Sequence, residues 1–287
     1  MWIAFAVASA LFAGLTSILA KIGVKNTDSN LATAARTVVV VLFAWLMVFV
    51  AGSQSAIASV DARSLLFLIL SGFSTGASWL CYFRALQAGD VNKVVPLDKS
   101  STVLTMLLSF LLLGEGFDLL KLTAMALIGI GTFMMIEREE PPPGASRGYG
   151  WLVYAGLAAV FASLTAIFGK VGISNVESNL GTAIRSMVAL AMAWLIVFMQ
   201  GKHHELKEVD KRSRLFIVLS GLATGLSWLC FYRALQDGPA SIVVPIDKLS
   251  ILVTIAFGCI VLREKLNKKP TIGLAMIVLG TLSLLLF

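Results

Sequence analysis

The strongest constraint on the fold is that the sequence repeats itself. The stretch VVPLDKSS at 94–101 returns as VVPIDKLS at 243–250, and a shift of 149 residues (247 − 98) aligns the two halves without a gap. Roughly four in ten aligned residues are identical. Polar residues also match, in the pairs Asn30 with Asn179, Arg36 with Arg185, and Asp98 with Asp247. Because hydrophobic composition alone cannot produce matched polar residues, the sequence predicts two copies of one structural unit.

The composition is that of a membrane protein. Hydrophobic residues make up 58% of the chain and charged residues 14%, and the mean hydropathy is +0.89. A soluble domain usually carries about 25% charged residues, and a membrane-spanning helix needs about 20 apolar residues. Ten apolar runs of that size are expected, near 2–23, 31–51, 65–87, 92–113, 118–136, 151–172, 180–200, 214–236, 241–262 and 269–287.

The number of spans in each copy predicts an inverted repeat. Each copy carries five spans, so the second copy must enter the membrane in the opposite orientation to the first. The predicted fold is an all-α integral membrane protein with ten transmembrane helices in two inverted five-helix repeats, 1–136 and 150–287, joined by a linker at 137–149.

The loop charges predict the orientation of the chain. Thirteen loop bases fall on one predicted side: Lys25, Lys93, Arg138, Arg147, Lys202, Lys207, Lys211, Arg212, Arg214, Arg263, Lys265, Lys268 and Lys269. Only Arg63 and Lys121 fall on the other side. The positive-inside rule then puts the linker in the cytoplasm and both termini outside. The net charge of +7 is explained by these bases, so no nucleic-acid partner is expected.

Several motifs in both copies resemble a known family. They are AKIG at 20–23 with FGKVG at 168–172, YFRALQAG with FYRALQDG, VVPLDK with VVPIDK, and LGE at 113–115, which copy two replaces by LRE. The chain resembles the EamA branch of the drug/metabolite transporter superfamily. The resemblance implies a multi-pass carrier of the inner (plasma) membrane that moves a small metabolite or drug, commonly outward. Each half is similar to half-length members that pair antiparallel, so a monomer is expected to suffice.

The repeated motif places an acid and a base inside the membrane. Asp98 with Lys99, and Asp247 with Lys248, lie about 9–10 Å from the start of their helices at about 1.5 Å per residue. A charge at the bilayer centre costs about 2.5–3.5 kcal/mol on insertion scales unless it faces a cavity or a partner. We therefore expect the four residues to line or gate a central cavity. The alternative is that the aspartates cap helices and the lysines extend to the headgroups.

Further candidate substrate-binding residues are paired between the copies. They are Arg36 and Arg185, Trp79 and Trp228, and Tyr82 and Tyr232. For the two tryptophans, dense core packing explains a place in the middle of a helix as well as a cavity wall does. Arginine binds carboxylate and phosphate with two parallel hydrogen bonds, and an excess of bases around a cavity favours an anionic or zwitterionic substrate.

Structural roles are expected for other repeated residues. Lys21, Lys170, Arg84 and Arg233 stand near helix ends, where bases usually extend to the headgroups. Asn30 and Asn179 are predicted as N-caps, and Glu115 and Glu264 as surface acids. The spacings Gly72-x-x-x-Gly76 and Gly221-x-x-x-Gly225 predict close packing between helices.

Three functions remain open. The first is a secondary transporter that exports a small polar metabolite by alternating access. The second is a proton-coupled exporter of cationic drugs that uses Asp98 and Asp247, although the first and sixth spans lack the acid used by small multidrug exporters of this superfamily. The third is a lipid-carrier flippase or a scaffold. No enzyme, cofactor or metal motif is present, and His203 and His204 are expected to be solvated. The sequence leaves the coupling ion and the direction of transport open.

Overall fold

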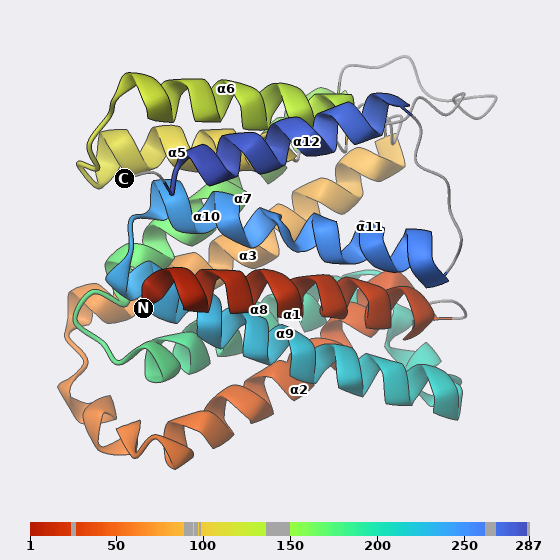
Figure 1. Cartoon of the computed structure of the whole chain (residues 1–287). Coiled ribbons are helices and arrows are strands. Elements are labelled where there is room, and N and C mark those ends of the chain that lie inside the picture. Colours follow the sequence, from red (N-terminus) through yellow and green to blue (C-terminus); the bar gives the residue numbers. More distant parts are fainter. Residues whose placement is uncertain are drawn as a thin grey trace.

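The computed structural model describes residues 1–23, 27–88, 94, 97, 99–135, 150–261 and 268–285. In these residues every regular element is a helix, and the helices form one bundle (Figure 1). In chain order they are α1 (Trp2–Gly23), α2 (Ser29–Val50), the 3-10 helix η1 (Ser53–Ser59), α3 (Ala62–Ala88), α5 (Ser101–Leu112), α6 (Leu119–Met134), α7 (Gly150–Gly172), α8 (Ser178–Met199), the 3-10 helix η2 (Lys202–Lys207), α9 (Lys211–Asp237), α10 (Ala240–Lys248), α11 (Ser250–Val261) and α12 (Lys268–Ser283).

Seven segments of the described chain have the length and hydropathy to cross a membrane. They are Trp2–Gly23, Ser29–Val50, Ala62–Ala85, Gly150–Gly172, Ser178–Met199, Lys211–Asp237 and Ala240–Phe257, and the apolar helices α5 and α6 are shorter. A helix of 22 residues is about 33 Å long, which exceeds the roughly 30 Å of a bilayer core. The protein is therefore a multi-pass membrane protein. Six predicted spans correspond to α1, α2, α3, α7, α8 and α9.

Acids, and not asparagines, begin the second helix of each half. Asp28 accepts hydrogen bonds from the backbone N–H groups of Asn30 and Leu31 at 2.9 and 3.1 Å. Glu177 takes the same place at the start of α8. The prediction that Asn30 and Asn179 are N-caps is therefore wrong, because both lie inside the first turn, where the acids have already filled the cap.

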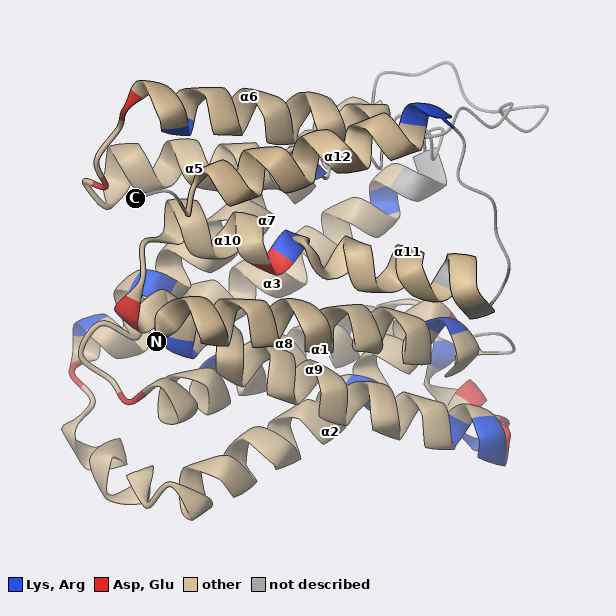
Figure 2. Ribbon diagram, in the orientation of Figure 1, with Lys and Arg blue, Asp and Glu red and all other residues tan. Residues whose placement is uncertain are grey.

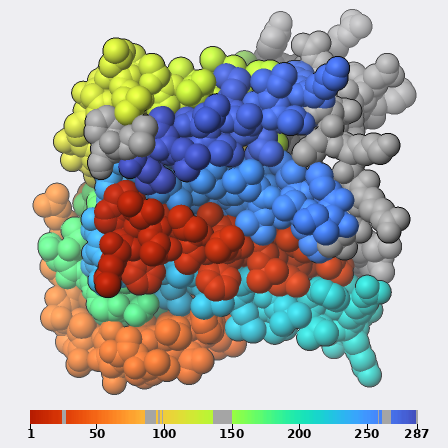
Figure 3. Space-filling view, viewed as in Figure 1, coloured from red at the N-terminus to blue at the C-terminus, as the bar shows by residue number. Residues whose placement is uncertain are grey.

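The helices of the two halves pack in a reciprocal pattern. Helix α1 packs along α9, and α3 packs along α7; α2 pairs with α8, and α6 pairs with α12. On the face shown in Figure 3, α1 is bordered by helices of the second half. The shift of 149 residues that aligns the sequence also exchanges these packing partners.

The predicted close packing at the glycine spacings is confirmed. A Cβ atom added to Gly76 would lie 2.2 Å from Met192 Cβ, and one added to Gly72 would lie 2.5 Å from the Arg185 carbonyl oxygen, so α3 touches the backbone of α8. The equivalent glycines of α9 approach α2, where a Cβ added to Gly221 would lie 2.6 Å from Val39.

The predicted span 241–262 is not one continuous helix. Helix α10 ends at Lys248 and α11 begins at Ser250, so Leu249 separates them. Pro245 inside α10 has no N–H to donate and disturbs the preceding turn. Figure 2 shows one acidic and one basic position at this junction, in the middle of the bundle. The apolar pattern alone did not predict this break, which lies one turn after the proline.

The ends of the bundle carry different charges. The starts of α9 and α12 lie at one end of the bundle, and the starts of α1, α3 and α6 lie at the opposite end (Figure 1). The first end, which includes η2, holds more bases (Lys202, Lys207, Lys211, Arg212, Arg214, Lys268 and Lys269) than the second (Arg63, Lys121, Lys170 and Arg233).

Candidate functional site

A cavity of about 260 Å³ lies between helices of both halves. Its lining residues come from α1, α3, α5, α7, α8, α9 and α10: Ala13, Thr75, Trp79, Ser101, Thr102, Thr105, Ala162, Thr165, Ala166, Arg185, Ser227, Trp228, Phe231, Tyr232, Val244, Asp247 and Lys248. Aromatic rings and hydroxyl groups make up much of this wall, with three charged side chains among them. In this small cavity, polar and charged groups share the wall with apolar side chains.

Arg185 of α8 is the most deeply buried charge at the cavity, with 1% of its surface exposed. Its Nε donates to Ser71 Oγ at 3.2 Å, and its Nη2 donates to Thr75 Oγ1 at 2.7 Å. The guanidinium carbon lies 4.8 Å from the ring centre of Trp228 and 4.5 Å from that of Tyr232. Hydroxyls and aromatic faces thus fix the orientation of this cation.

One nitrogen of Arg185 has no protein partner. Nη1 is buried and makes no hydrogen bond to any residue that the structure describes. A buried polar group without a partner costs about 1–3 kcal/mol, and more when it is charged. Since Arg185 lines the cavity, an acceptor inside the cavity would remove this cost.

The helix break brings Asp247 and Lys248 to the same cavity. Ser9 Oγ of α1 donates to Asp247 Oδ1 at 2.6 Å and lies 3.3 Å from Ser227 Oγ of α9. The Lys248 side chain is exposed at the cavity wall. The site therefore combines a buried guanidinium with a carboxylate held by a hydroxyl and an accessible ammonium.

The structure separates the predicted site residues into two groups. Six of them line the cavity: Trp79, Arg185, Trp228, Tyr232, Asp247 and Lys248. Arg36, Tyr82 and Lys99 are described and lie outside its wall, and Asp98 falls outside the described residues. The arrangement is thus asymmetric, although the sequence pairs are symmetric. Their roles in substrate binding stay predictions.

Sequence reasoning missed the hydroxyl groups of the cavity. Ser101, Thr102 and Thr105 lie on one face of α5, and Thr165 and Ser227 come from α7 and α9. Serine and threonine are common in membrane helices, where they bond to the backbone, and Thr105 Oγ1 does so with the carbonyl of Ser101 at 2.8 Å. In the sequence, this wall could have been predicted from the hydroxyl residues that recur on one face of the helix.

Glu115 is not a surface acid, so that prediction is wrong for this residue, while Glu264 lies outside the described residues. Its two carboxylate oxygens accept hydrogen bonds from the backbone N–H groups of Ala240 and Ser241 at 2.5 and 2.9 Å. These are the first residues of α10, at the positive end of the helix dipole, where an acid is favoured. A residue of the first half thereby caps the broken helix of the second half.

Lys170 also does more than extend to the headgroups. Its Nζ donates to the carbonyl oxygen of Gly238 at 2.7 Å and to that of Leu235, at the C-terminal end of α9. A cation is favoured at this negative end of a helix dipole. Glu115 and Lys170 therefore hold the corner between α9 and α10 (residues 235–241) from its two sides.

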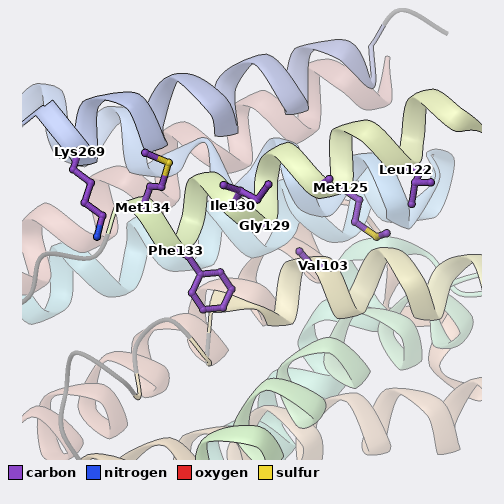
Figure 4. Close-up of a pocket in the computed structure, with 9 residues that line it drawn as sticks. Val103, Leu122, Met125, Gly129, Ile130, Phe133, Met134 and Lys269 are labelled. Carbon is purple, nitrogen blue, oxygen red and sulfur yellow. The ribbon is translucent and has the colours of Figure 1, made fainter.

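A larger groove lies on the outside of the bundle and has a different character. It measures about 550 Å³ and is lined mainly by α6, with Val103 of α5 and Lys269 of α12 at its borders (Figure 4). Ile130 and Phe133 in its wall are 53% and 51% exposed. Exposed apolar side chains on a membrane helix are suited to contact with lipid chains, and the groove lacks the polar groups of the cavity.

Known proteins are similar to this chain along its whole length. The family described as "EamA-like transporter family" matches twice, over residues 1–137 and 149–286. An "Uncharacterized transporter in cobO 3'region" from a Sinorhizobium species is 45% identical over 137 residues, which are 48% of this chain and 97% of the relative. An "Uncharacterized transporter" from Archaeoglobus fulgidus is 24% identical over 229 residues, covering 79% of this chain and 78% of that protein.

A solved structure extends the comparison to the fold. It is titled "Crystal structure of protein" and superposes with a TM-score of 0.77 at 15% identity, covering 99% of this chain and 96% of its own. At this identity the likeness shows a shared fold alone.

Proposed function

Because this chain belongs to the EamA-like transporter family, we propose that it is a secondary active transporter that exports a small polar metabolite, best a zwitterion. The substrate occupies the cavity of about 260 Å³. Its anionic group binds Arg185, and its cationic group lies toward Asp247. An anion without a cationic group is the next best substrate, since Lys248 can then balance Asp247.

The observation that carries the proposal is the unpartnered nitrogen of Arg185. This guanidinium is buried, oriented by Ser71 and Thr75, and left with Nη1 unsatisfied. Guanidinium groups bind carboxylates through parallel N–H groups. A carboxylate in the cavity would accept a hydrogen bond from Nη1 and neutralise the buried charge. The empty site therefore favours binding of an anionic group.

Transport proceeds by alternating access between two inverted five-helix repeats. The reciprocal packing of α1 on α9 and α3 on α7 supports this arrangement. The break between α10 and α11 supports it as well, because discontinuous helices line the sites of many secondary transporters. The basic end of the bundle faces the cytoplasm, so both termini lie outside. The energy comes from an ion or substrate gradient, since the sequence contains no nucleotide-binding motif.

Counterflow in proteoliposomes tests the proposal. Vesicles are loaded with one unlabelled compound, and the uptake of the same compound in labelled form is measured. The compounds tested are amino acids, other zwitterions, carboxylates and quaternary cations. The hit is then measured with Arg185→Lys, which keeps the charge and loses the paired N–H groups. Since a hydrogen bond to a charged group contributes about 1.5–3 kcal/mol, KM should rise about 10- to 100-fold. The matched control is Arg36→Lys, the sequence counterpart outside the cavity wall, which should change KM by less than about threefold. Equal effects of both variants would refute the assignment.

A second function has one observation in its favour. Asp247 accepts the hydrogen bond of Ser9 inside the cavity and can alternate between a proton and a cation. This arrangement suits a proton-coupled exporter of cationic drugs. Asp247→Asn would then abolish pH-driven uptake of lipophilic cations, whereas the first function requires flux of zwitterions or anions that depends on Arg185.

A further inference from the structure

A second groove lies at the basic end of the bundle, away from the cavity. It measures about 500 Å³ and lies between the start of α2, the 3-10 helix η2 and the start of α9. Leu31 and Ala35 of α2 and Ile217 of α9 form its apolar floor. Leu206 and Val218 in its wall are 41% and 42% exposed. None of its lining residues is shared with the cavity.

The rim of this groove is basic. Lys207 and Arg214 both line it. The Nε of Arg214 donates to the carbonyl oxygen of Val209 at 2.7 Å, and its Nη2 donates to that of Lys207 at 3.1 Å. These bonds fix the guanidinium beside the groove and leave its Nη1 unused by them. Arg214 is therefore held in place at the rim by the backbone of the segment that carries Lys207.

A polar side chain inside the groove lacks a partner. Thr27 lines the groove, and its Oγ1 is buried without a hydrogen bond to the described part of the chain. The neighbouring acid Asp28 is already paired with Lys202, so it does not neutralise the rim. The groove thus combines an apolar floor, two bases and an unsatisfied hydroxyl.

The repeat shows that the fold itself does not require these bases. Under the shift of 149 residues Lys207 corresponds to Ala58, and Arg214 corresponds to Leu65. The rule that loops facing the cytoplasm are basic accounts for more lysine and arginine in this loop. It does not account for an arginine fixed by two backbone carbonyls over an apolar groove.

We propose that this groove binds an anionic phospholipid. One acyl chain lies on the floor formed by α2 and α9, and the phosphate lies between Lys207, Arg214 and the hydroxyl of Thr27. Arginine suits the phosphate because its N–H groups match the oxygens of the anion. A base at the surface of an anionic leaflet adds attraction for such lipids.

Native mass spectrometry of the full chain in detergent tests the proposal. The protein is titrated with phosphatidylglycerol and, separately, with phosphatidylcholine of the same chain length. We expect phosphatidylglycerol to bind at least tenfold more tightly. The double variant Lys207→Gln/Arg214→Gln should abolish that preference, whereas Lys211→Gln/Arg212→Gln, which removes two bases of the same region outside the groove, should keep it.

Two further arms separate the alternatives. Val218→Trp fills the groove without a change of charge and should also lower phosphatidylglycerol affinity about tenfold, and circular dichroism checks that each variant is folded. Inorganic phosphate at about 10 mM, where charges are screened only beyond about 30 Å, should not displace the lipid. Equal losses in both double variants, equal binding of both lipids, or displacement by free phosphate would each overturn the proposal.

Discussion

Replacing Glu115 by glutamine should lower the free energy needed to open the first turn of α10, and the structure allows the size of this change to be estimated. The substitution removes the charge at the positive end of the helix dipole and one of the two acceptors for the N–H groups of Ala240 and Ser241. Loss of an N-cap costs about 0.5–2 kcal/mol, and loss of a favourable charge at a helix end costs about 0.3–1 kcal/mol. We expect about 1–2 kcal/mol, which is a 5- to 30-fold change in the opening equilibrium.

Hydrogen–deuterium exchange measures this change over the first turns of α10, which contain the two amides. A peptide that covers residues 238–246 should exchange about 5- to 30-fold faster in Glu115→Gln than in the wild type. The control is Asp118→Asn in the same loop, since Asp118 accepts from the N–H of Lys121 at 2.8 Å and caps only α6. That variant should accelerate exchange at the start of α6 and leave 238–246 unchanged. Unchanged exchange at 238–246 in Glu115→Gln would refute the reasoning.

Two other perturbations follow from packing and from pH. Gly76→Leu should lower the free energy of unfolding by about 1–3 kcal/mol, and with it the melting temperature, because a Cβ at this position overlaps Met192. The control Gly156→Leu, with open space around the glycine, should change the melting temperature little. Burial alone would raise the pKa of Asp28, but the hydrogen bonds from Lys202 and from backbone N–H groups outweigh it and lower that pKa. The stability from this carboxylate is therefore present above its ordinary pKa of about 4 and is lost as the pH falls through the lowered folded value. In the wild type, the melting temperature measured between about pH 7 and 3 should fall as this stability is lost, and Asp28→Asn should reduce the fall. Parallel curves of melting temperature against pH for the two proteins would contradict this role of Asp28.

The sequence predicted the elements that depend on long patterns. Six spans follow from apolar runs of about 20 residues, and the close packing at Gly72 and Gly76 follows from a spacing that both copies keep. Arg185 and Asp247 could be named because an intramembrane charge needs a cavity or partner. These inferences rest on properties of single helices.

The features that the sequence did not predict depend on contacts between distant segments. Glu115 lies 125 positions from Ala240, so nothing local shows that it caps α10. The asymmetry between Arg185 and Arg36 arises from which helices enclose each guanidinium. The break at Leu249 could not be inferred from Pro245, because a proline disturbs the turn before it and α10 continues for three residues past it.

The corner between α9 and α10 has a consequence for how the protein could move. Glu115 and Lys170 bear opposite charges, and each is matched to a helix end of opposite polarity within the same corner. If the corner moved away, both residues would lose their helix ends together, and no net charge would remain behind. The corner can therefore move away from Glu115 and Lys170 at a lower electrostatic cost than if only one of the two charges were left without its helix end.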